Sequence, residues 1–367
     1  MLVLVNLGGI RLISSGMYYA PKGKIDKAVG DEEFIFSVIG LDHGHIYGMC
    51  NGLIEAGATL KWVYDSDPEK VRIFQNVYPK VRVARCMEEI LSDGKVRLVA
   101  TATIPSNRCE LGIKVLSSGK DYFTDKAPFT SLEQLENAKN KVKETKLKYA
   151  VYYSERLHVE GATLAGELVN QGAIGRVLQV IGIGPHRIDL SQRPPWFFKK
   201  SCYGGILCDL GSHQIEQFLY YSGAQNATVA NSKVANYHHK QFPELEDYGD
   251  ATLIGDNGAT NYFRVDWFTP NGLRTWGDGR TIILGTDGYI EIRKYININY
   301  EKYGNHVFLV NHEGEYYFNA SGKYGYPFFK NFILDCIHRT ENAMGQEHIF
   351  KVAELSLKVQ EEAFLIE

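Results

Sequence analysis

The sequence predicts an α/β protein of two domains: an N-terminal doubly wound parallel sheet of the Rossmann type, and a C-terminal α+β domain with a large, mostly antiparallel, open-faced sheet. Over residues 33–154, buried strand-like runs alternate with helices of about 10–15 residues, the pattern of parallel βαβ units. Over residues 155–367, many short strand-like runs follow one another between turn signals such as Pro270-Asn271-Gly272. A length of 367 residues suits two domains better than one.

The elements of the first domain follow from apolar runs and from the residues that bound them. Strands are predicted over 34–39, 60–64, 97–102, 121–124 and 149–153. Helices are predicted over 45–56, 68–77, 87–92, 107–118 and 131–145. Pro68 fits a first helical turn, and Ser131 is a favourable helix start. Residues 1–32 have no clear period, so we expect an irregular extension there, with Met17 as an alternative natural start.

The second domain changes from alternating elements to a run of strands. Strands are predicted over 177–183, 228–237, 250–254, 260–268, 281–284, 289–295, 306–310 and 316–318. Helices are predicted over 161–171, 209–222, 326–339 and 348–364. We therefore expect a mostly antiparallel sheet that is covered by helices.

Composition and charge exclude several classes of function. A net charge of −3 and a pI near 6.4 give no sign of a nucleic-acid or membrane-surface partner, so we expect a small-molecule substrate. No segment approaches the roughly 20 apolar residues of a membrane-spanning helix. The 6 cysteines form no CxxC pair, and the first residues lack the features of a signal peptide. We therefore expect a cytoplasmic protein with reduced thiols.

The loop Gly40-Leu41-Asp42-His43-Gly44-His45 follows the first strand and precedes a helix, where a Rossmann phosphate loop should lie. The usual G-x-G-x-x-G pattern is only partly present, because Asp42 takes the second glycine position and His45 the third. A carboxylate at that position repels a pyrophosphate unless it points away or pairs with His43 or His45. Gly44 and Gly48 could restore close approach in a shifted register. On the loop alone, a dinucleotide site and a ligand-free turn are equally open.

A second acidic signal favours the dinucleotide. Asp65 lies 25 positions after Gly40, at the end of the second strand, where a carboxylate can bind both ribose hydroxyls. Ser66 and Asp67 follow it and no arginine is adjacent, so we expect NAD rather than NADP. Thr103 and Pro105, which follow the strand 97–102, are further candidates for the cofactor site. The alternative for Asp65 is a helix N-cap for the segment that begins at Pro68.

Three residues are candidates for proton and hydride chemistry. Lys126 follows the strand 121–124, so it lies at the carboxyl end of the sheet, where α/β proteins bind ligands, and it is also a candidate cofactor contact. Asp209 and His213 are four residues apart and would share one face of a helix. A histidine can move a proton near neutral pH, and an aspartate can orient it. Two alternatives stay open: solvated surface charges, or two metal ligands; no third ligand is nearby, so we expect no metal.

The order of these motifs resembles the Gfo/Idh/MocA family, which includes glucose–fructose oxidoreductases and inositol dehydrogenases, over about residues 34–365. Asp125-Lys126-Ala127-Pro128 is similar to the family's E-K-P element, with Asp for Glu and an extra Ala. The segment from Gly204-Gly205 to His213 is similar to its G-G-x-x-x-D-x-G-x-H element. The segments 172–177 and 285–291 resemble the entry to its second-domain sheet and its G-x-x-G strand turn.

The resemblance implies roles for the candidate residues. Lys126, Asp209 and His213 would converge on the substrate carbon beside the nicotinamide, with His213 as general acid/base, Asp209 as its support and Lys126 holding the substrate oxygen. The candidates for substrate binding are Tyr153, Glu155, Arg156, His186, Arg187 and Trp196. For the aromatic residues the alternative is loop packing, and for Arg187 it is a surface charge.

The resemblance also implies the activity: an NAD(P)-dependent oxidoreductase that transfers hydride between the nicotinamide and a hydroxyl carbon of a sugar, a cyclic polyol or a derivative. Two other functions are open. Some family members use bound NAD transiently to cleave glycosidic bonds without net redox, and the fold also supports non-catalytic NAD-bound regulators. A homodimer or homotetramer is implied as well.

Overall fold

The computed structural model describes residues 16–21, 23, 25–299 and 304–367. Residues 1–15, part of the predicted irregular extension, lie outside the described residues. The chain forms two compact units. The first contains residues 17–152 and 327–349, and the second contains Gly16, residues 153–326 and residues 350–367. Residues 327–349, which the sequence analysis placed in the second domain, therefore belong to the first unit.

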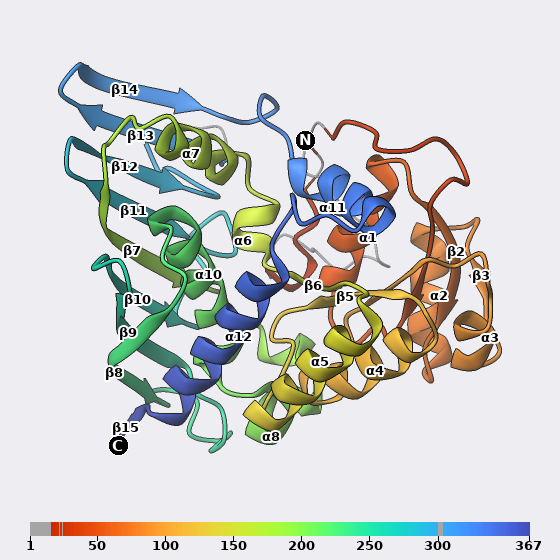
Figure 1. Cartoon of the computed structure of the whole chain (residues 1–367). Coiled ribbons are helices and arrows are strands. Elements are labelled where there is room, and N and C mark those ends of the chain that lie inside the picture. Colours follow the sequence, from red (N-terminus) through yellow and green to blue (C-terminus); the bar gives the residue numbers. More distant parts are fainter. Residues whose placement is uncertain (1–15, 22, 24, 300–303) are drawn as a thin grey trace. The chain divides into compact units, whose positions relative to one another are not determined.

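The first unit is built on a six-stranded parallel sheet with the order β3-β2-β1-β4-β5-β6, the doubly wound Rossmann order (Figure 1). The fold class predicted for this part of the chain is confirmed. The strands are β1 (Ile35–Ile39), β2 (Thr59–Tyr64), β3 (Arg82–Val83), β4 (Leu98–Thr101), β5 (Asp121–Asp125) and β6 (Tyr149–Tyr152). Strands β4, β5 and β6 are buried throughout, as their apolar runs predict.

Local capping chemistry explains where several helices of the first unit begin. The Ser131 side chain accepts a hydrogen bond from the Gln134 backbone at 3.2 Å, and Asp67 accepts one from Glu69 at 2.9 Å. The helices are α1 (His45–Glu55), α2 (Pro68–Val77), α3 (Met87–Leu91), α4 (Pro105–Ser117), α5 (Leu132–Thr145) and α11 (Pro327–His338). The 3₁₀ turn η2 (Gly16–Tyr18) precedes them.

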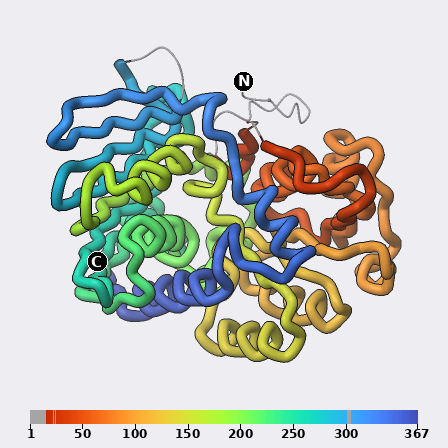
Figure 2. Tube along the Cα trace, turned by 45° about the horizontal axis from the view of Figure 1, so that its top comes forward, coloured from red at the N-terminus to blue at the C-terminus, as the bar shows by residue number. Residues whose placement is uncertain are grey.

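Helix α11 joins the first unit although it comes from the far end of the chain (Figure 1, Figure 2). It packs beside α1, and its Phe328 and Phe332 rings lie 5.8 and 5.1 Å from the Phe123 ring on β5. Farther along, the Gln346 side chain accepts from the Tyr149 amide and donates to the Tyr149 carbonyl, both at 3.0 Å. These contacts are made by residues distant in sequence, which is why no local pattern predicted them.

The second unit is built on a nine-stranded sheet with the order β14-β13-β12-β11-β7-β10-β9-β8-β15. Two strand pairs are parallel, β7 with β10 and β8 with β15, and the others are antiparallel. The predicted mostly antiparallel sheet is confirmed. The strands are β7 (Val177–Pro185), β8 (Ala227–Ala235), β9 (Tyr248–Gly255), β10 (Thr260–Asp266), β11 (Arg280–Gly285), β12 (Gly288–Arg293), β13 (His306–Asn311), β14 (Gly314–Asn319) and β15 (Phe364–Ile366).

One helix fixes the centre of this sheet. Helix α10 packs on β7 and β10, and Gln214 lies so close to Gly182 and Gly184 of β7 that a side chain at Gly182 would collide with it. The helical elements are α6 (Ser154–Leu157), α7 (Glu160–Asn170), η3 (Leu190–Gln192), η4 (Pro195–Phe198), α8 (Lys200–Tyr203), α9 (Ile206–Asp209), α10 (Gly211–Ser222) and α12 (Gln346–Glu361). The residues of α12 from Phe350 onward belong to this unit.

The structure corrects two predicted elements of the second domain. The predicted helix 209–222 is two helices, because α9 ends at Asp209 and α10 begins at Gly211. The predicted helix 348–364 ends at Glu361, and Phe364 instead begins β15, which pairs with β8. A three-residue strand has too short a pattern to be distinguished from a helix end in the sequence. Among the described residues, no helix is long and apolar enough to cross a membrane.

Candidate active site

The predicted phosphate loop lies at the carboxyl ends of β1 and β4. The Gly40 amide donates to the Tyr64 carbonyl at 2.9 Å, and the His43 amide donates to the Ala102 carbonyl at 2.9 Å. Gly40 has a φ of +85°, and a Cβ there would lie 2.8 Å from the Thr103 Cβ. Only glycine therefore fits at this turn. The next helix, α1, presents its N-terminus at the end of the loop, as an anion-binding Rossmann turn requires.

Asp42, the residue that breaks the glycine pattern, is neutralised by a lysine. Lys70 Nζ lies 2.5 Å from Asp42 Oδ1, while Oδ2 accepts hydrogen bonds from the Thr103 hydroxyl at 2.9 Å and the Ile104 amide at 3.2 Å. Burial disfavours the charge on Lys70, but Asp42, with smaller effects of neighbouring carboxylates, outweighs it and raises the pKa of Lys70. Of the two possibilities that the sequence left open, pairing of Asp42 with His43 or His45 is replaced by pairing with Lys70.

Asp65 holds the same loop from the end of β2. Its Oδ2 accepts from the Leu41 amide at 2.7 Å and its Oδ1 accepts from the Asp67 amide at 2.8 Å. The alternative of Asp65 as the N-cap of α2 is wrong, because Asp67 caps that helix. The carboxylate is half-buried. Its role in binding ribose hydroxyls stays a prediction.

The ion pair between Lys70 and Asp42 leads to a test on the dinucleotide. Replacing Lys70 by methionine leaves a bare carboxylate in the phosphate loop, and we expect the Kd for NAD to rise about tenfold, or about 1.4 kcal/mol. Titration of NADH fluorescence measures it. The double variant Lys70→Met/Asp42→Asn removes both charges and should bind NAD within about threefold of the parent protein. An unchanged Kd in the single variant would show that Asp42 faces away from the pyrophosphate.

Gly44 and Gly48 allow other residues of the same chain to approach them closely. A Cβ at Gly44 would lie 2.6 Å from the Met17 carbonyl and would collide with the Tyr18 ring. A Cβ at Gly48 would lie 2.8 Å from the Tyr152 hydroxyl. The sequence suggested that these glycines let a pyrophosphate approach. In the structure, their small size instead allows packing against residues 17–18 and β6.

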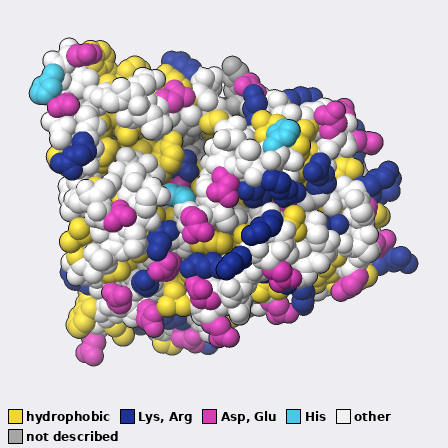
Figure 3. Space-filling view, viewed as in Figure 1, with side chains coloured by type: hydrophobic (Ala, Val, Ile, Leu, Met, Phe, Trp, Pro, Cys, Tyr) yellow, Lys and Arg dark blue, Asp and Glu magenta, His cyan; other side chains and the backbone are white. Residues whose placement is uncertain are grey.

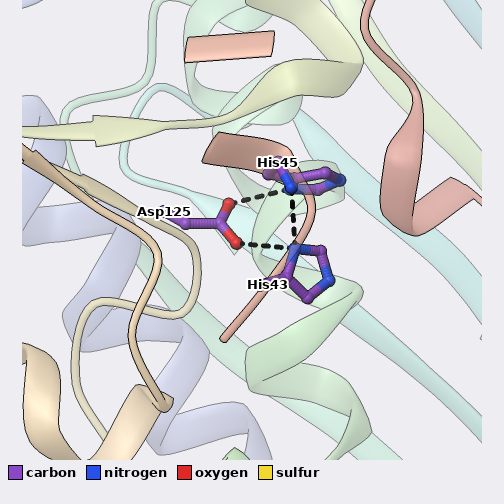
Figure 4. A group of neighbouring side chains, drawn as sticks. All are labelled: His43, His45 and Asp125. Carbon is purple, nitrogen blue, oxygen red and sulfur yellow. Dashed lines mark hydrogen bonds and ion pairs between the residues drawn. The ribbon is translucent and has the colours of Figure 1, made fainter. Parts of the chain in front are cut away.

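Two loop histidines converge on Asp125, the residue before Lys126 (Figure 4). His45 Nδ1 lies 2.8 Å from Asp125 Oδ1, and His43 Nδ1 lies 3.2 Å from Oδ2. All three residues are buried. Burial opposes ionisation of Asp125, but His45, Arg108 and His43 outweigh it and hold the pKa of this carboxyl well below its usual range. The cluster therefore ties the phosphate loop to the end of β5.

The same three side chains have the composition of a metal site, with ligand atoms within 4.8 Å of one another. Two contacts weigh against a cation. The Arg108 guanidinium lies 3.4 Å from Asp125 Oδ2, and the His45 backbone amide donates to His43 Nδ1, the atom that would bind the ion. A fixed positive group next to the carboxylate raises the cost of a second one. We interpret the cluster as a hydrogen-bonded support.

Lys126, the lysine of the predicted reaction centre, is buried directly after β5. Its carbonyl accepts a hydrogen bond from Arg108, which also donates to the Ala127 carbonyl at 3.1 Å and to the Thr103 carbonyl at 2.7 Å. Arg108 is itself fully buried on α4. One guanidinium therefore joins the backbone at Lys126 to the backbone at Thr103, while Pro105 begins α4.

Asp209 and His213 lie in the second unit, and both are buried. Asp209 ends α9, and His213 is in the first turn of α10, with its amide bonded to the Leu210 carbonyl at 3.3 Å. We had expected the two residues to share one face of a single helix. The break at Leu210 instead places them in two different helices. The Tyr153 ring lies edge-on to the His213 ring, with centroids 6.2 Å apart.

The other predicted substrate residues are also in the second unit, and most are already engaged there. Arg156 Nη2 lies 2.5 Å from Glu216, and the guanidinium lies 3.8 Å from the Tyr220 ring centre. Arg187 donates to the Pro270 and Leu273 carbonyls and is buried, so the alternative of a surface charge is wrong. Their binding of substrate stays a prediction.

The aromatic candidates lie in one connected group of rings in the second unit, because the Phe197 ring is 5.3 Å from the Trp267 ring. The His186 ring lies 5.5 Å from the Trp267 ring and 4.6 Å from the Trp276 ring. Half-buried Trp196 lies in η4, 6.2 Å from the Phe197 ring. Sequence reasoning missed four charged or polar residues that the geometry makes prominent, because each meets its partner only in the folded chain: Lys70, Arg108, Gln214 and Lys294.

Comparisons with known proteins agree with this geometry. Residues 37–153 match the model of an oxidoreductase family with an NAD-binding Rossmann fold, and residues 163–291 match the GFO/IDH/MocA C-terminal domain. The chain is 52% identical to an oxidoreductase of Erwinia carotovora atroseptica whose crystal structure superimposes with a TM-score of 0.89, covering 91% of this chain and 100% of that one.

More distant relatives carry specific activities. The scyllo-inositol 2-dehydrogenase (NAD(+)) of Bacillus subtilis is 29% identical over 265 residues, which cover 70% of this chain and 72% of the relative. A levoglucosan dehydrogenase in complex with NADH is 18% identical with a TM-score of 0.73, covering 90% of this chain and 96% of that one, and shows a shared fold.

Proposed function

This chain belongs to the Gfo/Idh/MocA oxidoreductase family, and we propose that it is an NAD-dependent dehydrogenase of a sugar, a cyclic polyol or a derivative of one. The family membership establishes an NAD-binding oxidoreductase. The observation that carries the finer proposal is that Lys126, Asp209 and His213 are all present, Lys126 in one motif and Asp209 and His213 together in another. A scyllo-inositol dehydrogenase among the relatives supports a polyol or sugar substrate.

The residues of the first unit fit the dinucleotide. The glycine turn at Gly40 directly follows β1, α1 presents its N-terminus at the end of the same loop, and Lys70 cancels the charge of Asp42. Asp65 and Asp67 would repel a 2′-phosphate, so NAD is favoured over NADP. When bound, NAD accepts or returns the hydride of the substrate carbon.

In the proposed reaction, the substrate C–H bond breaks as hydride leaves, the O–H proton passes to His213 and a carbonyl forms. Asp209 stabilises the imidazolium, and Lys126 holds the substrate oxygen and favours its ionised form. Turnover in reverse returns the same proton from His213. Figure 3 shows acidic and basic side chains interspersed on the face in view, in keeping with a small-molecule substrate. A homo-oligomer and a cytoplasmic location stay predictions.

The test begins with the protein as it is purified. Mass spectrometry of the nucleotide released on denaturation should find NAD, and NADH absorbance should rise with at least one of a panel of inositols, aldoses and their derivatives. We expect kcat/KM to be at least about tenfold higher with NAD than with NADP, since like charges in a binding site cost affinity. Cleavage of aryl glycosides without added cofactor and without net NADH formation would overturn the dehydrogenase proposal in favour of glycoside cleavage.

A further inference from the structure

A buried ion pair in the second unit joins Glu155, one of the predicted substrate residues, to Lys294, for which the sequence predicted no role. Lys294 Nζ lies 2.7 Å from Glu155 Oε2, and the two side chains are 0% and 3% exposed. Glu155 is on the short helix α6, and Lys294 directly follows β12. Backbone bonds to Gly279 at 3.0 Å and Asn305 at 2.9 Å hold Lys294 on both sides. A charged pair this deeply buried is costly to desolvate, so removal of either partner leaves an uncompensated charge.

The carboxylate of Glu155 connects this pair to the helix that carries His213. Gln214 Nε2 donates to Glu155 Oε2 at 2.9 Å, and Gln214 directly follows His213 in the first turn of α10. The amide group of Gln214 lies directly against Gly182 and Gly184 of β7. Glu155 therefore reaches the start of α10 through one hydrogen bond.

The second oxygen of Glu155 faces a histidine. Within the described part of the chain, Glu155 Oε1 accepts no hydrogen bond, and His186 Nε2 is 3.7 Å away. Burial opposes ionisation of Glu155, but Lys294, His213 and His186 outweigh it and hold the pKa of this carboxyl below its usual range. Electrostatic coupling is reciprocal, so the same carboxylate stabilises a positive charge on His213.

We propose that Glu155, fixed by Lys294 and Gln214, is a positioning residue for His213 that supplies a buried negative charge to its imidazole. The catalytic meaning of this link rests on the proposed role of His213 as proton acceptor; the electrostatic link itself does not. Lys294 opposes the link, because its ammonium lies 2.7 Å from the same carboxylate and is positively charged.

Several other charged or titratable groups could also affect the titration of His213. Asp209 precedes His213 by four residues, and the Tyr153 hydroxyl group is on the ring packed against His213. Glu216 is paired with Arg156, and neither residue is replaced in the variants described below. His186 also faces Glu155 and is a second imidazole near that carboxylate. Its signal must therefore be followed separately.

The test measures the imidazole titration of His213 by NMR in the full-length protein labelled at histidine, with His213→Gln and His186→Gln spectra to assign the two signals. Glu155→Gln removes the negative charge and should lower the titration midpoint of His213 by about one unit. Lys294→Met leaves Glu155 uncompensated and should raise it by a similar amount. The double variant Glu155→Gln/Lys294→Met, a neutral pair of similar size, should fall between them.

The opposite signs distinguish this proposal from a purely structural role, which would move both single variants alike or neither. Glu160→Gln is the matched control: Glu160 is a buried carboxylate of the same unit that accepts from the Gly322 amide and, at 2.8 Å, from the Gly325 amide. It should leave the His213 midpoint unchanged. If Glu155→Gln does not fold, the Lys294→Met variant alone tests the proposal, through the expected rise of the His213 titration midpoint.

Shifts of the same sign, or no shift in the two single variants, would overturn the proposal. The result is independent of turnover. If the shifts appear but His213→Gln keeps full activity, the proposed function fails and the electrostatic link stands. If His213→Gln is inactive and no shift appears, the positioning role alone fails. In the active enzyme, the lower limb of the kcat/KM profile should move with the NMR midpoint.

Discussion

Replacing His213 by alanine is expected to lower kcat by a factor of about 10²–10⁴, the contribution of a positioned general acid/base, while the Kd for NAD changes by less than about threefold. The reason is that a general acid/base acts on the substrate proton, while the residues proposed to hold the dinucleotide are unchanged in this variant. Lys126→Ala should also abolish turnover with NAD binding within a few-fold. Steady-state kinetics on the true substrate and titration of NADH fluorescence measure the two quantities.

His312→Ala is a matched control for the loss of an imidazole. His312 lies in the turn between β13 and β14 and its side chain is 84% exposed, so its removal should leave kcat unchanged. Full activity of His213→Ala on the true substrate would contradict the assignment. A loss of NAD binding in parallel with activity would instead indicate that the variant perturbs the fold.

Replacing Arg108 by methionine is expected to destabilise the first unit by about 3–5 kcal/mol, the cost of breaking a buried ion pair by removing one partner. Arg108 is fully buried, lies 3.4 Å from Asp125 and donates to three backbone carbonyls. Methionine has a similar volume but leaves those carbonyls and the carboxylate without their donor. Urea unfolding measured by fluorine NMR of fluorotryptophan-labelled protein reports it, because Trp62 is in the first unit and the three other tryptophans are in the second.

The pH dependence of this deficit gives an independent check. The pKa of Asp125 is depressed in the folded protein, so its contribution to stability is present above the ordinary carboxyl pKa of about 4 and is lost as the pH falls toward the folded value. The deficit of Arg108→Met should therefore be full at pH 7 and should shrink below about pH 4. Arg72→Met, which removes an exposed pair with Glu69, should cost less than about 1 kcal/mol. An equal cost for both variants would contradict the burial argument.

The sequence by itself determined the fold class and most of the strands and helices. Alternating apolar runs and helical periods predicted all but the two-residue strand β3 of the first sheet, and Pro68 and Ser131 placed two helix starts within a residue. These signals are local: apolar periodicity, a proline in a first turn and a capping hydroxyl act within a few residues. The candidate residues Lys126, Asp209 and His213 were also found in the sequence, because each lies in a short motif.

Only the tertiary structure decided how the charges around these motifs are balanced. Asp42 meets Lys70 from 28 positions away, His45 meets Asp125 from 80, and Lys294 meets Glu155 from 139. No local pattern encodes such pairs, since their attraction becomes strong only where folding removes both partners from water. The motifs identify the residues proposed to act in the site. Their buried partners, which are distant in the sequence, determine how these residues are positioned and how their charges are balanced.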